Sequence, residues 1–370
     1  MPNRKSFFCL LLASLALPAG LRAQVDLEQS HSTASLRGID APAPGVAWAS
    51  GSGGTVLRSE DGGYLWQPCS VPKGADKLDF RGVQGFDAQT AVVMSSGPGE
   101  QSKVFKTSDG CQTWKLVFEN PDETGFFDVL RRVTSSQMYL MGDPVGGKFA
   151  MFFSPDAGTS WFIADDPGLE AAAGAGAFAA SNSSLFALGN VLFAGAGGSA
   201  GASVYFTHGQ CAPGAAKDAP CPIVWSRTAV PLAGGSAGAG VFSLAGRTIA
   251  NLSGKLTEVV VAVGGDYEKP DATEGTAAWS GDGGQHWTAA HTMPHGYRSA
   301  VVFDPGTQAW LAVGPNGMDV SFDNGQNWRA IKPAANAPAG IDQGWNAIAL
   351  PYVAGAKGRI GKLRPEIFKR

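Results

Sequence analysis

The chain has 370 residues with 28 basic and 31 acidic side chains, a formal net charge of −3 that gives no electrostatic reason to expect nucleic-acid binding. Glycine (51 residues) and proline (23) are abundant, only 16% of residues are charged, and no apolar run of about 20 residues, the length of a membrane span, occurs beyond the N-terminus. Because 44% of the residues are hydrophobic, the composition excludes disorder and predicts an all-β fold of short strands and tight turns.

Residues 1–23 have the layout of a secretory signal peptide. Two basic residues precede an apolar run over residues 7–17, and Ala23 supplies a small residue before a cleavage point at Gln24. Cleavage would leave 25 basic and 31 acidic residues, a net charge of −6. We therefore expect an exported protein, periplasmic or extracellular, whose single domain spans residues 24–370 and has no transmembrane span.

An eight-residue pattern, S/T-x-D-x-G-x-x-W, recurs through the chain. The copies begin at Ser59, Thr107, Ser154, Ser280 and Ser321, and a degenerate copy runs from Thr207 to Trp225. In each copy the polar side chains can bond the turn's own backbone, glycine supplies a positive φ, and tryptophan begins the next strand. We interpret the aspartates and tryptophans as structural: Asp61, Trp66, Asp109, Trp114, Asp156, Trp161, Asp282, Trp287, Asp323 and Trp328.

Each copy closes a unit of four short strands. Upstream of Thr107, for example, the pattern predicts strands over Phe80–Gln84, Thr90–Met94 and Val104–Thr107. Units of four strands at a period of roughly 40–50 residues are typical of propeller blades.

The ends of the chain complete the count of blades. The segment after Gly344 supplies only three strands, over Trp345–Leu350, Tyr352–Ala354 and Arg359–Leu363, and Gln24–Ser32 can supply the fourth. We therefore predict a single seven-bladed β-propeller of four-stranded antiparallel blades, closed by the N-terminal strand. Six blades would require discarding the terminal segment, and eight would require splitting the repeat over residues 237–289.

Four cysteines remain after cleavage, and an even number in an exported chain permits disulfides. Cys211 and Cys221 bracket a Pro- and Ala-rich insert, and we predict that they pair. A bond between Cys69 and Cys111 would require two neighbouring repeats to bring them together, and the sequence leaves it open.

The repeat resembles the Asp-box, or bacterial neuraminidase repeat, of sialidases, sortilin-type receptors, some endoglucanases and the Ycf48-related photosystem II stability and assembly factors. The resemblance covers nearly all of residues 30–365. An inner strand opening with hydrophobic-Arg-x-hydrophobic, and a second strand ending in Val-Gly or Met-Gly, are most similar to Ycf48-related proteins and their non-photosynthetic bacterial relatives. The resemblance implies the fold, whereas its members include enzymes, receptors and assembly factors.

Four arginines stand where inner strands are expected to begin: Arg37, Arg81, Arg131 and Arg298. Equivalent positions in different blades converge on the axis, so the arginines would form a cationic rim suited to a carboxylate, a phosphate or an acidic peptide. The alternative is that each arginine braces its blade through an acid such as Asp79 or Asp128. In Ycf48-like proteins a comparable basic patch holds a partner polypeptide, and the resemblance implies a docking role here.

Loops on the same rim add further candidates. Tyr267 and His295 could line the pocket with the arginines, and Asp143, Asp266 and Glu268 are the acids placed for proton transfer. His291 and His295 share one loop, but a third ligand is not visible locally, so we expect no metal.

The enzyme alternatives lack parts. The segment most similar to the sialidase arginine signature, Phe/Tyr-Arg-Ile-Pro, is Leu36-Arg37-Gly38-Ile39, which lacks the proline. The sequence also contains no dinucleotide fingerprint and no haem-attachment motif. We therefore predict a non-catalytic, monomeric, cofactor-free propeller that binds a protein or an acidic ligand through its arginine-bearing rim. A glycoside hydrolase, sialidase-like or of another Asp-box type, is the alternative.

Overall fold

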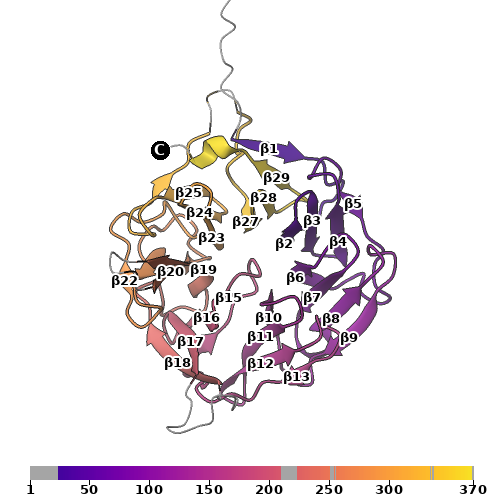
Figure 1. Ribbon diagram of the computed structural model, residues 1–370, viewed down its shortest axis with the longest axis horizontal. Helices are drawn as coiled ribbons and strands as arrows, with labels where there is room; N and C mark the ends of the chain where they lie inside the picture. The colour runs from indigo at the N-terminus through magenta and orange to yellow at the C-terminus, as the bar shows by residue number, and fades with distance from the viewer. Residues whose placement is uncertain are drawn as a thin grey trace, which may run out of the picture.

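The computed structural model describes residues 24–209, 223–250, 254, 256–333, 335 and 337–368. In these residues the regular structure is β-strand apart from two 3-10 turns, η1 (Gly99–Gln101) and η2 (Pro365–Phe368). No helix in the described ranges has the length and apolar character needed to cross a bilayer. The sheets stand radially around a central axis (Figure 1), which makes the fold a β-propeller.

Five sheets have four antiparallel strands each, and the chain visits the strands of four of them in order from the axis outward. The first two sheets comprise β2 (Leu36–Ala43), β3 (Val46–Gly51), β4 (Thr55–Ser59) and β5 (Gln67–Pro68), then β6 (Asp79–Gly85), β7 (Ala91–Ser96), β8 (Lys103–Thr107) and β9 (Lys115–Glu119). The next two comprise β10 (Phe127–Arg132), β11 (Met138–Val145), β12 (Lys148–Ser154) and β13 (Phe162–Ile163), then β23 (Ala300–Asp304), β24 (Ala309–Gly314), β25 (Gly317–Ser321) and β26 (Arg329–Ala330). The strands expected from the repeat pattern agree with these bounds to within one or two residues.

A nine-stranded sheet lies between β13 and β23. Its strands are β14 (Ala175–Gly176), β15 (Leu185–Leu188), β16 (Val191–Gly198), β17 (Ser203–Gly209), β18 (Ile223–Ala229), β19 (Ala239–Ala250), β20 (Leu256–Asp266), β21 (Ala277–Ser280) and β22 (Thr288–Ala289). The halves β15–β18 and β19–β22 meet through one residue pair, Gly197 on β16 with Gly240 on β19. A Cβ on Gly197 would lie 2.3 Å from the carbonyl oxygen of Ala239, so the contact requires glycine.

The two ends of the chain share the fifth four-stranded sheet. It consists of β27 (Trp345–Ala349), β28 (Tyr352–Gly355), β29 (Ile360–Leu363) and β1 (Val25–Glu28), with β1 antiparallel to β29. Arg364, just after β29, forms two hydrogen bonds of 2.6 Å with the carboxylate of Asp26 on β1. N-terminal and C-terminal segments are therefore held side by side, as Figure 1 also shows.

The repeated turns have a common hydrogen-bond pattern. In the turn at Ser59, the hydroxyl of Ser59 donates to Asp61 and accepts from the backbone N–H of Gly63, while Asp61 accepts from the N–H of Leu65. The turns at Thr107, Ser154, Ser280 and Ser321 repeat these three bonds. The aspartates thus satisfy the backbone of their own turns.

The tryptophans that follow these turns pack between neighbouring sheets. Trp66 is fully buried against β27–β29 residues such as Tyr352, with the two rings edge to face at 5.8 Å. The indoles of Trp161, Trp287 and Trp328 donate to a carbonyl of their own turn, whereas that of Trp114 donates to Ser70 of the preceding repeat.

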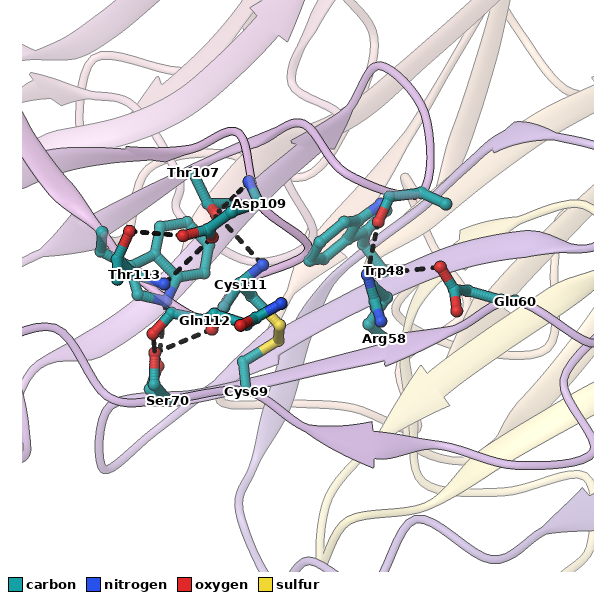
Figure 2. The surroundings of a disulfide bond; sticks show 12 residues. Trp48, Arg58, Glu60, Cys69, Ser70, Thr107, Asp109, Cys111, Gln112 and Thr113 are labelled. Carbon is teal, nitrogen blue, oxygen red and sulfur yellow. Dashed lines mark hydrogen bonds and ion pairs between the residues drawn. A yellow bond between two sulfur atoms is a disulfide. The ribbon is translucent and has the colours of Figure 1, made fainter.

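A disulfide joins Cys69, just after β5, to Cys111 in the second repeated turn (Figure 2). Ser70 strengthens this junction, because its hydroxyl donates to the carbonyls of Cys111 and Gln112 at 2.8 Å. The Cys69–Cys111 pairing, which could not be decided from the sequence, therefore links the first two sheets covalently. The pairing predicted for Cys211 and Cys221 falls outside the described residues.

Candidate functional site

A cavity of about 560 Å3, which we call the axial cavity, lies at the face where the inner strands begin. Its lining includes one residue from each of five inner strands: Arg37 of β2, Arg81 of β6, Asp128 of β10, Phe242 of β19 and Asn346 of β27. These strands surround the axis (Figure 1). The volume falls in the range of ligand pockets, about 300–1,000 Å3.

A β-bulge places each of these five side chains. The register with the second strand shifts between Leu36 and Gly38, and the same shift occurs at Phe80/Gly82, Phe127/Val129, Val241/Ser243 and Trp345/Ala347. The residue inside each shift is the one that lines the axial cavity. A bulge adds an unpaired residue and re-aims its side chain, so one repeated backbone irregularity builds the lining.

Residues 177–183, which we call the plug segment, contribute to the lining of the axial cavity. Ala177, Phe178, Ala179 and Ala180 line the cavity. Beyond them Ser181 donates to the carbonyl of Ser299 at 2.6 Å, and Asn182 accepts from the N–H of Leu130 at 2.8 Å. The plug segment therefore reaches inner strands on both sides of the axis.

Arg37 and Arg81 form the cationic wall. Arg81 is paired with Asp79 at 2.8 Å, and its side chain is 30% exposed. The guanidinium of Arg37 has no hydrogen-bond or ion-pair partner within the described residues, although it is largely enclosed. Burial and then the positive charge of Arg81 lower the pKa of Arg37, and the negative charge of Asp79 opposes them; a guanidinium stays charged in proteins. An unpaired, partly desolvated cation favours an anionic ligand.

Asp128 and Asp143 form an acidic wall beside Arg81. Asp128 is 2% exposed, and its Oδ2 atom has no hydrogen-bond partner in the described structure. Burial, followed by the negative charge of Asp143, raises the pKa of Asp128 well above its usual range. Burial also raises the pKa of Asp143, whose Oδ1 atom accepts a bond from the N–H of Ala177 at 2.9 Å. The wall can therefore hold a proton.

Aromatic rings make the opposite wall. Phe178 stacks on Phe242 with centroids 3.9 Å apart, and Tyr297 meets Phe242 edge to face at 4.8 Å. Tyr267 stands at the opening with half of its surface exposed. Burial raises the pKa of Tyr297 far above its usual range, so its hydroxyl stays protonated. The axial cavity thus combines cationic, acidic and aromatic walls.

Arg298 does not line the axial cavity, contrary to the four-arginine rim predicted from the sequence. Its side chain is fully buried, and Nε donates to Asp319 at 2.7 Å while a terminal nitrogen donates to Asn316. Ser299, the next residue, lines the cavity instead. Tyr297 and Ser299, the residues on either side of Arg298 in the chain, both line the cavity, so an offset of one residue places the arginine in the blade interior.

Arg131 also lies away from the axial cavity. It stands three residues beyond Asp128, toward the other end of β10, with its guanidinium carbon 6.0 Å from the centroid of the Phe186 ring. Its Nε atom is buried without a partner in the described residues. The bulge position of β10 carries an acid, so the rim is mixed in charge.

The remaining candidates divide in the same way. Tyr267 and Asp143 line the axial cavity, whereas His295 is bonded to Asp319 at 3.0 Å beside Arg298. Asp266 is buried and accepts from Ser236, and Glu268 is not part of the lining. The described residues contain no cluster of three metal-ligating side chains.

Sequence reasoning missed Asp128, Phe242 and Asn346 as lining residues. Each follows a fully buried apolar residue, Phe127, Val241 or Trp345, as Arg37 follows Leu36. Aligning the inner strands on that apolar residue rather than on arginine would have found all three.

Comparison with known proteins finds solved structures with the same fold. The chain superimposes on "YCF48 bound to D1 peptide" with a TM-score of 0.56 and 15% identity, covering 92% of this chain and 96% of that one. For YCF48 from Cyanidioschyzon merolae the TM-score is 0.53 at 18% identity, covering 93% and 100%. An ancestral GH74 enzyme gives 0.53 at 12% identity, covering 89% of this chain but 45% of that one.

These similarities define a Ycf48-like β-propeller fold. No protein-family model matches the sequence, and no curated protein sequence matches it. At such low identity the solved structures establish the fold alone, and the function must be argued from the axial cavity.

Proposed function

We propose that this chain is an exported, monomeric β-propeller that binds an acidic segment of a protein partner in the axial cavity, as an assembly or stability factor. The observation that carries the proposal is the unpaired guanidinium of Arg37 in that cavity. Enclosing an arginine without a partner costs free energy, unless a ligand supplies the missing negative charge and hydrogen-bond acceptors. Arg81, with one carboxylate already bound, adds a second positive charge beside Arg37.

The similarity to YCF48 supports a protein partner, because one of the matched structures holds a D1 peptide. The rigid setting of the axial cavity also supports binding. Paired strand residues flank each of its five bulged residues, and buried hydrogen bonds hold the plug segment, so little ordering cost remains when a ligand binds.

Export is supported by the signal-like residues 1–23 and by the Cys69–Cys111 disulfide, since such bonds persist in oxidising compartments. A second disulfide between Cys211 and Cys221 is part of the proposal. We place the protein in the periplasm or outside the cell.

We also propose seven blades, which follow if the nine-stranded sheet is divided at the single Gly197–Gly240 pair and β1 completes the last blade. The aspartates of the repeated turns serve the fold, because their oxygens are occupied by their own turn backbones.

The test is binding of an acidic peptide to the purified chain, together with capture of partners from the native envelope fraction. The variant pair is Arg37→Ala and Arg81→Ala, and the matched control is Arg227→Ala, an exposed arginine on β18 outside the cavity. We expect salt-sensitive binding that weakens about tenfold or more for each cavity variant and is unchanged for the control. Equal binding by all three variants would refute the proposal.

Glycoside hydrolysis is a second candidate, favoured by the raised pKa of Asp128 beside Asp143 in the same cavity. Glycosidases use two carboxyl groups, one of which is protonated. A screen of aryl glycosides with the wild-type chain and with Asp128→Asn and Asp143→Asn tests it. If the wild-type chain turns over a glycoside and each substitution abolishes that turnover, glycoside hydrolysis is favoured over the proposed binding function.

A further inference from the structure

The axial cavity offers more than a positive charge, because its acidic wall adjoins its cationic wall. The charge of Arg81 acts both on Arg37, whose pKa it lowers, and on Asp128, whose pKa it also lowers. Asp143 in turn acts on Asp128. The lining therefore holds two like-charged pairs, Arg37 with Arg81 and Asp128 with Asp143, and the two pairs adjoin between Arg81 of β6 and Asp128 of β10.

We propose that the axial cavity selects a segment carrying an acidic and a basic group close together, with the acidic group on Arg37 and the basic group on Asp128 and Asp143. This inference rests on the proposed binding of an acidic segment and adds a second requirement to it. The partner would be a protein segment in which glutamate or aspartate stands near lysine or arginine. A purely acidic segment would pair with the cationic wall and leave the acidic wall without a partner.

Asp128 is the residue that would contact the basic group. Its side chain is more than nine-tenths buried, it lines the cavity, and its Oδ2 atom has no hydrogen-bond partner in the described part of the chain. A buried carboxyl oxygen without a partner is expensive to maintain. The bulge between Phe127 and Val129 places Asp128 in the lining of the cavity, where a ligand can supply the missing donor.

The neighbouring carboxyl explains why the donor should be cationic. Asp128 and Asp143 repel each other when both are ionised, and Arg81 is already committed to Asp79. A lysine or arginine side chain placed against both carboxyls relieves the repulsion and donates several charge-assisted hydrogen bonds. Two carboxyls are too few ligands for a metal site of this kind, and the described residues offer no third within reach.

The aromatic wall suits the rest of such a segment. Tyr267 is about half exposed at the opening, and Phe242 lies behind it with ring centroids 6.3 Å apart. The aliphatic stem of a lysine or arginine can pack on these rings while its charged end reaches the acidic wall.

The test compares two fluorescently labelled, end-capped heptapeptides by anisotropy. In the acidic probe glutamate alternates with glycine, and in the mixed probe the central glutamate is replaced by lysine. The proteins are the wild-type chain, Arg37→Ala, Asp128→Asn and Asp143→Asn. The control is Asp76→Asn, which makes the same substitution at an exposed residue outside the cavity.

We expect Asp128→Asn to weaken binding of the mixed probe about tenfold, while the acidic probe binds it as tightly as the wild type or more tightly. Asp76→Asn should change neither affinity. If Asp128→Asn does not fold, as judged by circular dichroism, Asp143→Asn gives the same comparison.

The outcomes separate the two proposals. If Arg37→Ala weakens the acidic probe but Asp128→Asn and Asp143→Asn leave the mixed probe unchanged, the inference of a basic group is wrong and the proposed function stands. If the wild type binds neither probe at millimolar concentration, or if Arg37→Ala weakens neither, both are wrong.

Discussion

Arg298 and Asp319 form an ion pair whose side chains are 0% and 1% exposed, with Nε of the arginine 2.7 Å from Oδ2 of the aspartate. Arg37, by contrast, lines the axial cavity with no such partner in the described residues. Two arginines that look alike in sequence therefore occupy opposite electrostatic situations. Arg298 is paired inside a blade, whereas Arg37 lines a cavity without an ion-pair partner among the described residues.

Replacing one member of the buried pair should destabilise the fold strongly. We expect Arg298→Ala to lower the free energy of unfolding by about 3–5 kcal/mol, because Asp319 stays buried with only its contacts to His295. The double variant Arg298→Leu, Asp319→Leu should recover part of that loss. Urea unfolding of the three proteins measures it, and a loss below about 1 kcal/mol for Arg298→Ala would contradict the assignment.

Arg37→Ala should leave stability almost unchanged. The guanidinium makes no hydrogen bond or ion pair in the described structure, so its removal breaks no native polar contact. We expect a free energy of unfolding within about 0.5 kcal/mol of the wild type, or slightly above it. A loss of 2 kcal/mol or more in urea unfolding would show that Arg37 braces the blade instead.

The Cys69–Cys111 disulfide should be a major stabilising element. It closes a loop with a sequence separation of 42 residues, for which the chain-entropy model gives about 4 kcal/mol. We therefore expect dithiothreitol to lower the free energy of unfolding by about 2–4 kcal/mol. Thermal and urea unfolding with and without reductant measure the effect, and the Cys69→Ala, Cys111→Ala variant should not respond to reductant.

Cys111 has a backbone role besides the disulfide. Its φ is +63°, and glycine stands at the same position in the four other repeated turns, as at Gly63 with φ +90°. Once the disulfide is absent, we expect Cys69→Ala, Cys111→Gly to be about 1 kcal/mol more stable than Cys69→Ala, Cys111→Ala. Equal midpoints in urea would mean that the turn tolerates a side chain freely.

Asp109 should contribute to acid stability. Hydrogen bonds from Thr113, first from its side chain and then from its backbone, lower the pKa of Asp109 to about 2. In the native state Asp109 therefore binds its proton at a lower pH than in the unfolded chain, where the pKa of aspartate is near 3.9. This stabilisation is complete above about pH 4 and is lost as the pH falls toward 2.

The measurement is the urea midpoint of wild type and Asp109→Asn between pH 2 and 6. The variant should be less stable than the wild type at pH 6, and the gap should narrow as the pH approaches 2. A gap that stays constant over this range would assign the effect of the substitution to geometry rather than to charge.

The repeat made the fold predictable from the sequence. Five copies of one turn fixed the period, and strands such as β6 and β27 lie within one or two residues of their expected bounds. Packing between sheets depends on the buried tryptophans that the same motif contains. The repeated pattern therefore predicts both the local turns and the packing of neighbouring units against each other.

The axial cavity could be predicted only in part, because its lining depends on register. Arg37 and Arg81 were found because arginine happens to occupy the bulge position in β2 and β6. In β10 and β27 the same position holds Asp128 and Asn346, which no search for arginine detects. A one-residue ambiguity in register reverses the side on which a residue lies, as Arg298 illustrates.

The plug segment ties distant parts of the ring together. Ser181 donates to the carbonyl of Ser299, just before β23, and Asn182 accepts from the N–H of Leu130 on β10. Residues 177–180 of the same segment line the axial cavity. A partner segment bound there as we propose would therefore rest on this tie as well as on the inner strands, and binding would be felt by two sheets that are far apart in the sequence.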